Sequence, residues 1–100
     1  MIQGSTPMHV FVLPFSTDMI HKVRISYDQK KKIVLTKETI DVSMIDNTIF
    51  FRLTQNETLL FDALIPVRIQ LHVLTTDGEA LPSIIKTVPV NILLDKRVIE

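Results

Sequence analysis

The sequence predicts an all-β fold, an antiparallel Ig-like β-sandwich of about seven strands with one or two short helical turns. Within residues 66–75, positions 67–73 alternate strictly between apolar and polar side chains, the period of a strand with one buried and one wet face. Turn signals recur at about 8–12 residues, which is typical of a sandwich or small barrel. Helical signals are confined to residues 15–20, where Ser16 or Thr17 can cap a turn, and to residues 54–61.

Residues 66–75 are the predicted centre of the sheet. The inward side chains are expected to be Val67, Ile69, Leu71 and Val73. The Asp-Gly pair at 77–78 predicts a tight turn in which the glycine takes a positive φ. The chain then returns as a seventh strand over residues 80–90. Because Pro82 and Pro89 cannot donate to a ladder, this strand is expected at an edge or with a kink.

Five strands are expected before the central one, over residues 8–13, 21–28, 33–38, 39–45 and 48–53. The first is apolar on both faces apart from His9, which is typical of a strand that is covered on both sides or packs at an interface. In the other four, the predicted inward side chains are Val23, Ile25, Tyr27, Ile33, Leu35, Ile40, Val42, Met44, Ile49, Phe51 and Leu53. Polar residues 29–32 form a hairpin tip, and residues 46–47 form a two-residue turn.

The 100 residues are expected to form a single domain, residues 1–100. Residues 1–7 are expected to be a loose N-terminal arm, because Gly4, Ser5 and Pro7 favour irregular structure. Thr54 and Glu57 have the spacing of a capping box, which predicts a helical turn across the end of the sandwich. The terminal segment, residues 91–100, is expected to be a short helix or an added strand.

Composition excludes several classes of function. Lysine plus arginine equals aspartate plus glutamate at 11 each, so the basic surplus of a nucleic-acid binder is missing. Without cysteine there is no disulfide framework and no thiolate ligand or nucleophile. No apolar stretch approaches the ~20 residues of a membrane helix, and no signal peptide is expected, because the first cationic side chain is Lys22. Hydrophobic residues make up 46%, so the excess lies either at a protein interface or in a core rich in Ile, Leu and Val.

No pattern in the sequence indicates catalysis, and we expect no enzyme activity, cofactor or metal. His9, His21 and His72 are scattered and are interpreted as isolated surface residues. The strand carboxylates are interpreted as solvated faces, and two glycines cannot build a phosphate-cradling loop. The basic cluster at residues 30–32 is either a solvated hairpin tip or an anchor for an acidic partner.

Phe50 is the main candidate for an interaction surface. By alternation it lies on the face opposite Ile49 and Phe51. The candidate interface comprises Phe50, Val34, Ile45, Val10 and Val12. These residues either fill a second small core under a terminal segment or form an exposed patch that docks a protein partner. The expected partner is another protein or a second copy of the chain in a homo-oligomer, since zero net charge gives weak self-repulsion.

Six stretches form a recognisable pattern: residues 4–9, 11–15, 23–27, 35–38, 53–61 and 69–80. Together they resemble small proteins encoded by phages and prophages of Gram-positive bacteria. The layout also resembles Ig-like sandwiches of phage tail and baseplate proteins. The resemblance implies a non-enzymatic structural or interaction protein, a tail, baseplate or accessory component found in the virion or, during assembly, in the cytoplasm of the bacterial host. The alternative is a carbohydrate-binding or adaptor module, although the chain has no Trp for a sugar platform and its one Tyr is predicted to point inward.

Overall fold

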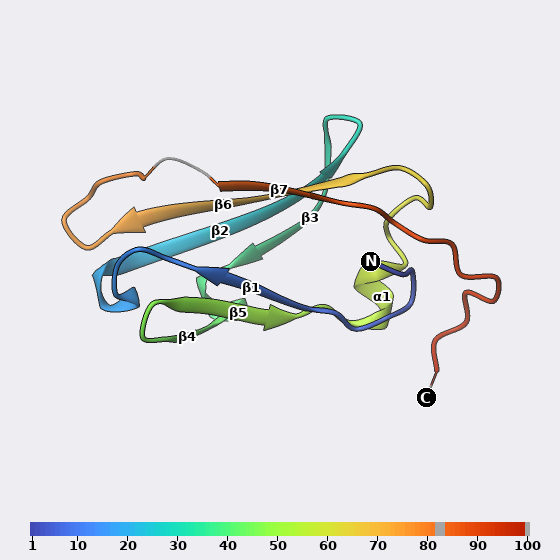
Figure 1. Ribbon diagram of the computed structural model, residues 1–100, viewed down its shortest axis with the longest axis horizontal. Helices are drawn as coiled ribbons and strands as arrows, with labels where there is room; N and C mark the ends of the chain where they lie inside the picture. The colour runs from blue at the N-terminus through green and yellow to red at the C-terminus, as the bar shows by residue number, and fades with distance from the viewer. Residues whose placement is uncertain (82–83, 100) are drawn as a thin grey trace.

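The computed structural model describes residues 1–81 and 84–99, and these form two antiparallel sheets packed face to face (Figure 1). One sheet has the strand order β1-β5-β4, and the other has the order β3-β2-β6-β7. This arrangement confirms the predicted all-β sandwich. The strands are β1 Met8–Val12, β2 Ile20–Gln29, β3 Lys32–Glu38, β4 Ser43–Ile45, β5 Thr48–Arg52, β6 Val67–Thr75 and β7 Ile84–Val88. The short helical elements are η1 Thr17–Met19, η2 Thr39–Asp41 and α1 Gln55–Thr58.

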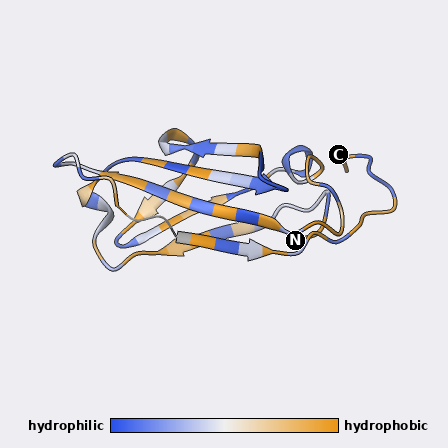
Figure 2. Ribbon diagram, turned by 90° about the horizontal axis from the view of Figure 1, so that it is seen from above, coloured by the Kyte–Doolittle hydropathy of each residue, from blue (hydrophilic) through white to orange (hydrophobic). Residues whose placement is uncertain are grey.

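The core lies between the inner faces of the two sheets. Strand β6 is its centre as predicted, because Val67, Ile69, Leu71 and Val73 are all buried. Figure 2 shows the strands banded alternately hydrophobic and hydrophilic, the pattern of strands with one face in the core. The predicted inward residues of β2 and β5, and the one directly after β5, are confirmed as buried; they are Val23, Ile25, Tyr27, Ile49, Phe51 and Leu53.

The hairpin of β2 and β3 contains a bulge that corrects one inward prediction. Tyr27 lies opposite Leu35, but the next residue of β2, Asp28, lies opposite Ile33. The extra residue, Val34, shifts the alternation, since opposed residues in an antiparallel pair share a face. Ile33 therefore points outward with 68% of its surface exposed, whereas Leu35 packs partly against the core as predicted.

The predicted fourth strand, residues 39–45, is wrong over its first half. Residues Thr39–Asp41 form a 3-10 turn, and the strand is limited to Ser43–Ile45. The Thr39 hydroxyl accepts from the Val23 amide at 3.0 Å, and the Asp41 carboxylate accepts from the Glu38 amide at 2.8 Å, so local side chains satisfy the backbone here. Ile40 is 93% exposed and does not point inward, while Val42 and Met44 pack partly against the core.

The predicted turns and caps are present. Gly78 has φ +90°, and Asp46 has φ +54° in the two-residue turn between β4 and β5. At α1, the Thr54 hydroxyl accepts from the Glu57 amide at 3.2 Å, and the Glu57 carboxylate accepts from the Thr54 amide at 2.9 Å. At η1, the Ser16 hydroxyl caps Asp18. Strand β7 is an edge strand as predicted; of the two prolines, Pro82 lies outside the described residues.

Both terminal segments differ from expectation. The Gln3 side chain is buried, and its amide nitrogen donates to the Phe61 carbonyl at 2.6 Å, so residues 1–3 are anchored and not loose. The Gln3 backbone amide donates to the Asn91 carbonyl at 3.1 Å, which ties the two ends of the described chain together. Within residues 91–99 the chain forms a single bridge, from Asn91 to Ile2, and neither a helix nor an added strand. Local propensity does not reveal a distant partner such as Phe61, which is why the arm was expected to be loose.

Candidate functional site

The outer face of the three-stranded sheet carries a cluster of exposed apolar side chains, here called the apolar face. The strand register places Val10 opposite Phe50, and places both Val12 and Ile45 opposite Thr48, so these side chains project on the side away from the core. The exposed fractions are 67% for Val12, 59% for Ile45, 44% for Met8 and 43% for Val10, and Phe50 is half-buried among them. The apolar face comprises Met8, Val10, Val12, Ile45 and Phe50.

Four of the five residues of the predicted interface share this face, and the fifth does not. Val34 lies on β3 in the other sheet and packs partly against the core. It was grouped with Phe50 because alternation fixes a residue's face within a strand but not the sheet to which the strand belongs. Met8 was missed, although its spacing from Val10 and Val12 is the signal that places it on the same side.

The outer face of the four-stranded sheet is of the opposite character. Its central strands present mainly polar side chains, namely Arg24, Ser26, Asp28, Arg68, Gln70 and His72, with Leu74 of β6 as an apolar exception. The Arg68 Nε donates to Asp28 Oδ1 at 2.9 Å, and this hydrogen bond lowers the pKa of the Asp28 carboxyl. A hollow of about 300 Å³ lies over this ion pair and is also lined by Ser26, Lys31, Ile33, Gln70 and Ile85. Because the acid and the base neutralise each other, the hollow presents no unpaired charge from Asp28 or Arg68 to a ligand.

Lysine side chains protect the edges of the four-stranded sheet. Lys37 of β3 lies opposite Ile25, and Lys86 of β7 lies opposite Ile69, so both point toward the buried side. Inward-pointing charges on edge strands discourage pairing with a further strand, since the added sheet would bury them. Lys86 Nζ crosses to the other sheet, where it donates to the Val10 carbonyl at 3.0 Å and lies 4.6 Å from the Phe11 ring centroid.

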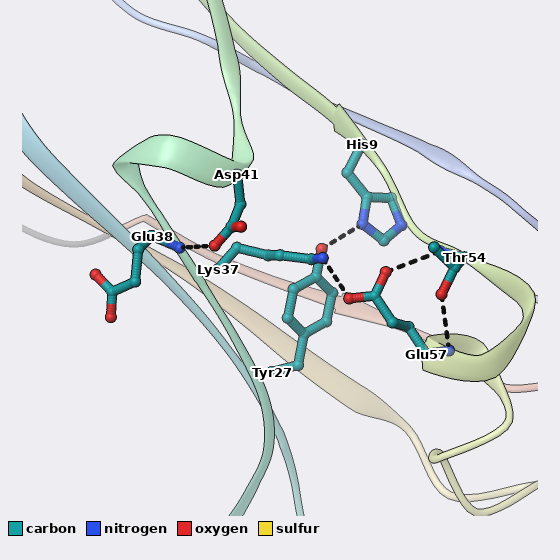
Figure 3. A network of polar contacts seen from close by, with 7 residues as sticks. All are labelled: His9, Tyr27, Lys37, Glu38, Asp41, Thr54 and Glu57. Atoms are coloured by element: carbon teal, nitrogen blue, oxygen red, sulfur yellow. Dashed lines mark hydrogen bonds and ion pairs between the residues drawn. The ribbon is translucent and has the colours of Figure 1, made fainter.

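A polar network joins the two sheets near α1 (Figure 3). His9 Nδ1 lies 2.6 Å from the Tyr27 hydroxyl, and Lys37 Nζ forms an ion pair with the Glu57 carboxylate. His9 is thus half-buried and partnered, which corrects its prediction as an isolated surface residue. Among the described residues, no buried polar side-chain atom lacks a hydrogen-bond partner. The network therefore holds the sheets and α1 in place and leaves none of its own buried groups unpaired for chemistry.

The pKa values in this network follow from burial and pairing. Burial lowers the pKa of His9, and the positive charge of Lys86 acts in the same direction, so the neutral ring is favoured. Burial raises the pKa of Tyr27 and keeps its hydroxyl protonated. Burial alone would raise the pKa of Glu57, but hydrogen bonds from Lys37 and from the Thr54 amide outweigh it, so the pKa falls and the carboxylate stays ionised.

Searches against protein-family models, curated proteins and solved structures gave no match. Within residues 1–81 and 84–99, no cluster of three or more His, Asp and Glu side chains could hold a metal ion. The same residues include no helix with the length and apolar character needed to cross a membrane. The apolar face is therefore the candidate site that the geometry singles out.

Proposed function

We propose that the chain is a non-enzymatic interaction domain that binds another protein through the apolar face. The observation that carries this proposal is the contrast between the two outer surfaces of the sandwich. Both are outer sheet faces, yet the central strands of one present mainly polar side chains, with exposed Ile33 and Ile85 confined to its edge strands, whereas the other presents Met8, Val10, Val12, Ile45 and Phe50 together. Exposed apolar side chains that cluster in this way are typical of protein interaction sites.

Binding at the apolar face would release a useful amount of free energy. Burying a whole aliphatic side chain contributes about 1.5–3 kcal/mol, and four of these side chains are roughly half exposed. Covering them would contribute on the order of 3–6 kcal/mol before the costs of association are subtracted. Arg52, at the margin of the face, already donates to the Thr6 carbonyl at 2.7 Å. The surface therefore offers apolar contact to a partner, with the charged Arg52 at its margin.

The resemblance to phage and prophage proteins supplies the setting of the proposal: a structural or accessory component of a virion, in the tail or baseplate, whose partners are other virion subunits. The alternative of a carbohydrate-binding module gains no support from Tyr27, because a sugar platform requires an exposed ring and Tyr27 is fully buried. The polar network near α1 has its buried groups paired within the fold, which is consistent with an interaction role for the domain.

Site-specific photocrosslinking in particles purified from the host tests this proposal. A photoreactive phenylalanine replaces Val12 on the apolar face, and a matched control replaces the exposed His72 on the other outer face. The position 12 probe is expected to give discrete adducts with one protein, which mass spectrometry identifies, and the position 72 probe is expected to give few. Equal adducts from both positions, or adducts from position 72 alone, would contradict the proposal. Particles without the chain would contradict the virion setting.

A further inference from the structure

The free edge of β1 belongs to the residues that also form the apolar face. In an antiparallel ladder, residues that exchange hydrogen bonds alternate with residues that do not. The Leu13 amide donates to the Asn47 carbonyl at 2.8 Å, and the Leu53 amide donates to the Pro7 carbonyl at 3.0 Å. Residues 7 and 13 are therefore hydrogen-bonded positions of this ladder. Since such positions recur at every second residue, His9 and Phe11 also turn their backbone groups toward β5. Met8, Val10 and Val12 therefore turn theirs toward the free edge.

The position of Lys86 agrees with this assignment. Lys86 Nζ reaches the Val10 carbonyl from β7, which lies at the edge of the opposite sheet. Among residues 1–81 and 84–99, no other hydrogen bond reaches the free side of β1. The remaining amides and carbonyls of Met8, Val10 and Val12 on that side are left for another strand.

The other sheet edges are less suited to strand addition. Strands β3 and β7 carry the inward-pointing Lys37 and Lys86, and β4 is three residues long. Strand β1 has five residues, and none of them is charged when His9 is neutral. A single added strand at β1 would satisfy the unpaired backbone groups and also extend the apolar face.

We propose that a second copy of this chain adds its own β1, antiparallel, to the free edge of β1. A two-fold axis at Val10 places Val10 opposite Val10 of the second copy, and Met8 opposite Val12 of the second copy. All three residues then exchange backbone hydrogen bonds through their free sides, and their outer side chains form one continuous apolar stripe. This inference deepens the proposed function, because the joined sheet presents a doubled apolar face to further subunits.

Two charged side chains of each copy bear on this pairing. Lys86 Nζ lies 3.0 Å from the Val10 carbonyl, so the two-fold axis brings it close to its counterpart and their repulsion opposes the dimer, whereas Arg52 does not oppose it. Arg52, the charged residue on the outer face of β5, lies opposite Met8 at one end of the register. With a rise of about 3.3 Å per residue and a strand spacing of about 4.8 Å, the two Arg52 positions in the dimer are about 19 Å apart. This distance exceeds the Debye length of about 8 Å at physiological ionic strength, so their repulsion is screened. The chain's net charge of zero adds no general repulsion.

The contact is small, and the dimer is expected to be weak in isolation. A strand of five residues is about 17 Å long, so the pairing buries far less than the ~800 Å² per partner of a standard interface. Lys86 also competes, because it occupies the Val10 carbonyl. Association is therefore expected between about 10 µM and 1 mM, the range typical of small interfaces.

Light scattering coupled to size-exclusion chromatography over this concentration range tests the inference. Wild type is expected to rise from 11.4 kDa toward twice that mass. Val10→Pro removes an edge amide that β5 does not use and should hold the mass at the monomer value. Ile45→Asp changes the apolar face on β4, away from β1, and should leave the dimer intact. Lys86→Met frees the Val10 carbonyl and should shift the midpoint several-fold toward lower concentration.

Three other outcomes of these measurements would decide against the β1 pairing or between it and another mode of association. The β1 pairing is overturned if wild type and Lys86→Met both stay monomeric to 1 mM. In that case the proposed function still stands if the crosslinking probe at position 12 gives adducts with a different virion protein. A dimer abolished by Ile45→Asp but not by Val10→Pro would replace edge pairing with face-to-face stacking. If thermal melts show that Val10→Pro does not fold, the Lys86→Met shift decides, because a midpoint that does not move overturns the proposal.

Discussion

Leu71→Ala is expected to be strongly destabilising, because Leu71 lies at the centre of the core. Its side chain is 2% exposed, and its strand partner on β2, Ile25, is fully buried. The substitution removes three carbons, which at about 0.8 kcal/mol each is a transfer loss of about 2.4 kcal/mol. The cavity left behind adds to this, so the free energy of unfolding should fall by about 3–4 kcal/mol.

Urea denaturation followed by far-ultraviolet circular dichroism measures this change. With a denaturant slope of about 1–1.5 kcal/mol per molar, the midpoint should fall by about 2–4 M. The matched control is Gln70→Ala, one residue away on the outer face, which should change the free energy of unfolding by less than about 0.5 kcal/mol. Equal losses from both substitutions, or a larger loss from Gln70→Ala, would refute the assignment of inner and outer faces on β6.

Three further predictions concern Gly78, His9 and zinc binding. Gly78→Val should cost more than about 1 kcal/mol in the same urea melts, because φ is +90° and a β-branched residue tolerates that conformation poorly; a neutral result would indicate a looser loop. The pKa of His9 is lowered from its ordinary value of 6.5, so its contribution to stability is fully present above pH 6.5 and is lost progressively as the pH falls below 6.5 through the lower pKa of the folded state. His9→Gln should flatten the stability profile between pH 8 and 5, and an unchanged slope would contradict this. Calorimetric titration with zinc should show no stoichiometric sub-micromolar site, and such a site would contradict the scattered placement of the three histidines.

Alternation in the sequence predicted the strands that contribute most to the core. Residues 67–75 form β6, and the inward positions predicted for β2 and β5, namely Val23, Ile25, Tyr27, Ile49 and Phe51, are all buried. Pro82 and Pro89 predicted an edge strand, which β7 is. These predictions succeed because burial on one face of a strand leaves a direct record in residue type.

The errors arise where a local feature interrupts the period or where a distant contact decides the structure. The bulge at Val34 moved Ile33 outward, and the hydrogen bonds of Thr39 and Asp41 replaced half a strand with a 3-10 turn. A single sequence shows neither the bulge nor the partner. The anchoring of Gln3 depends on Phe61, which lies 58 residues away.

The candidate site was predictable in part for the same reasons. Alternation placed Ile45 and Phe50 on outward faces, and the structure brings them together with Val10 and Val12. The first strand was expected to be apolar on both faces, so alternation assigned no face to Val10 and Val12. It could not assign Val34 to the other sheet, because sheet membership depends on which strands pair. The inward orientation of Lys37 and Lys86 was also not predicted, because a lysine in a strand is usually solvated.

Oxidative footprinting of two methionines tests most directly whether the apolar face is a protein-binding surface. Met8 lies on this face with 44% of its surface exposed, and Met19 lies in η1, outside the face, with 51% exposed. In the dilute isolated chain, both should be oxidised to the sulfoxide at similar rates, because exposure governs susceptibility. In the native assembly purified from the host, Met8 should be protected several-fold while Met19 remains reactive. Equal oxidation of Met8 and Met19 in the assembly, or protection of Met19 alone, would contradict an interface at the apolar face.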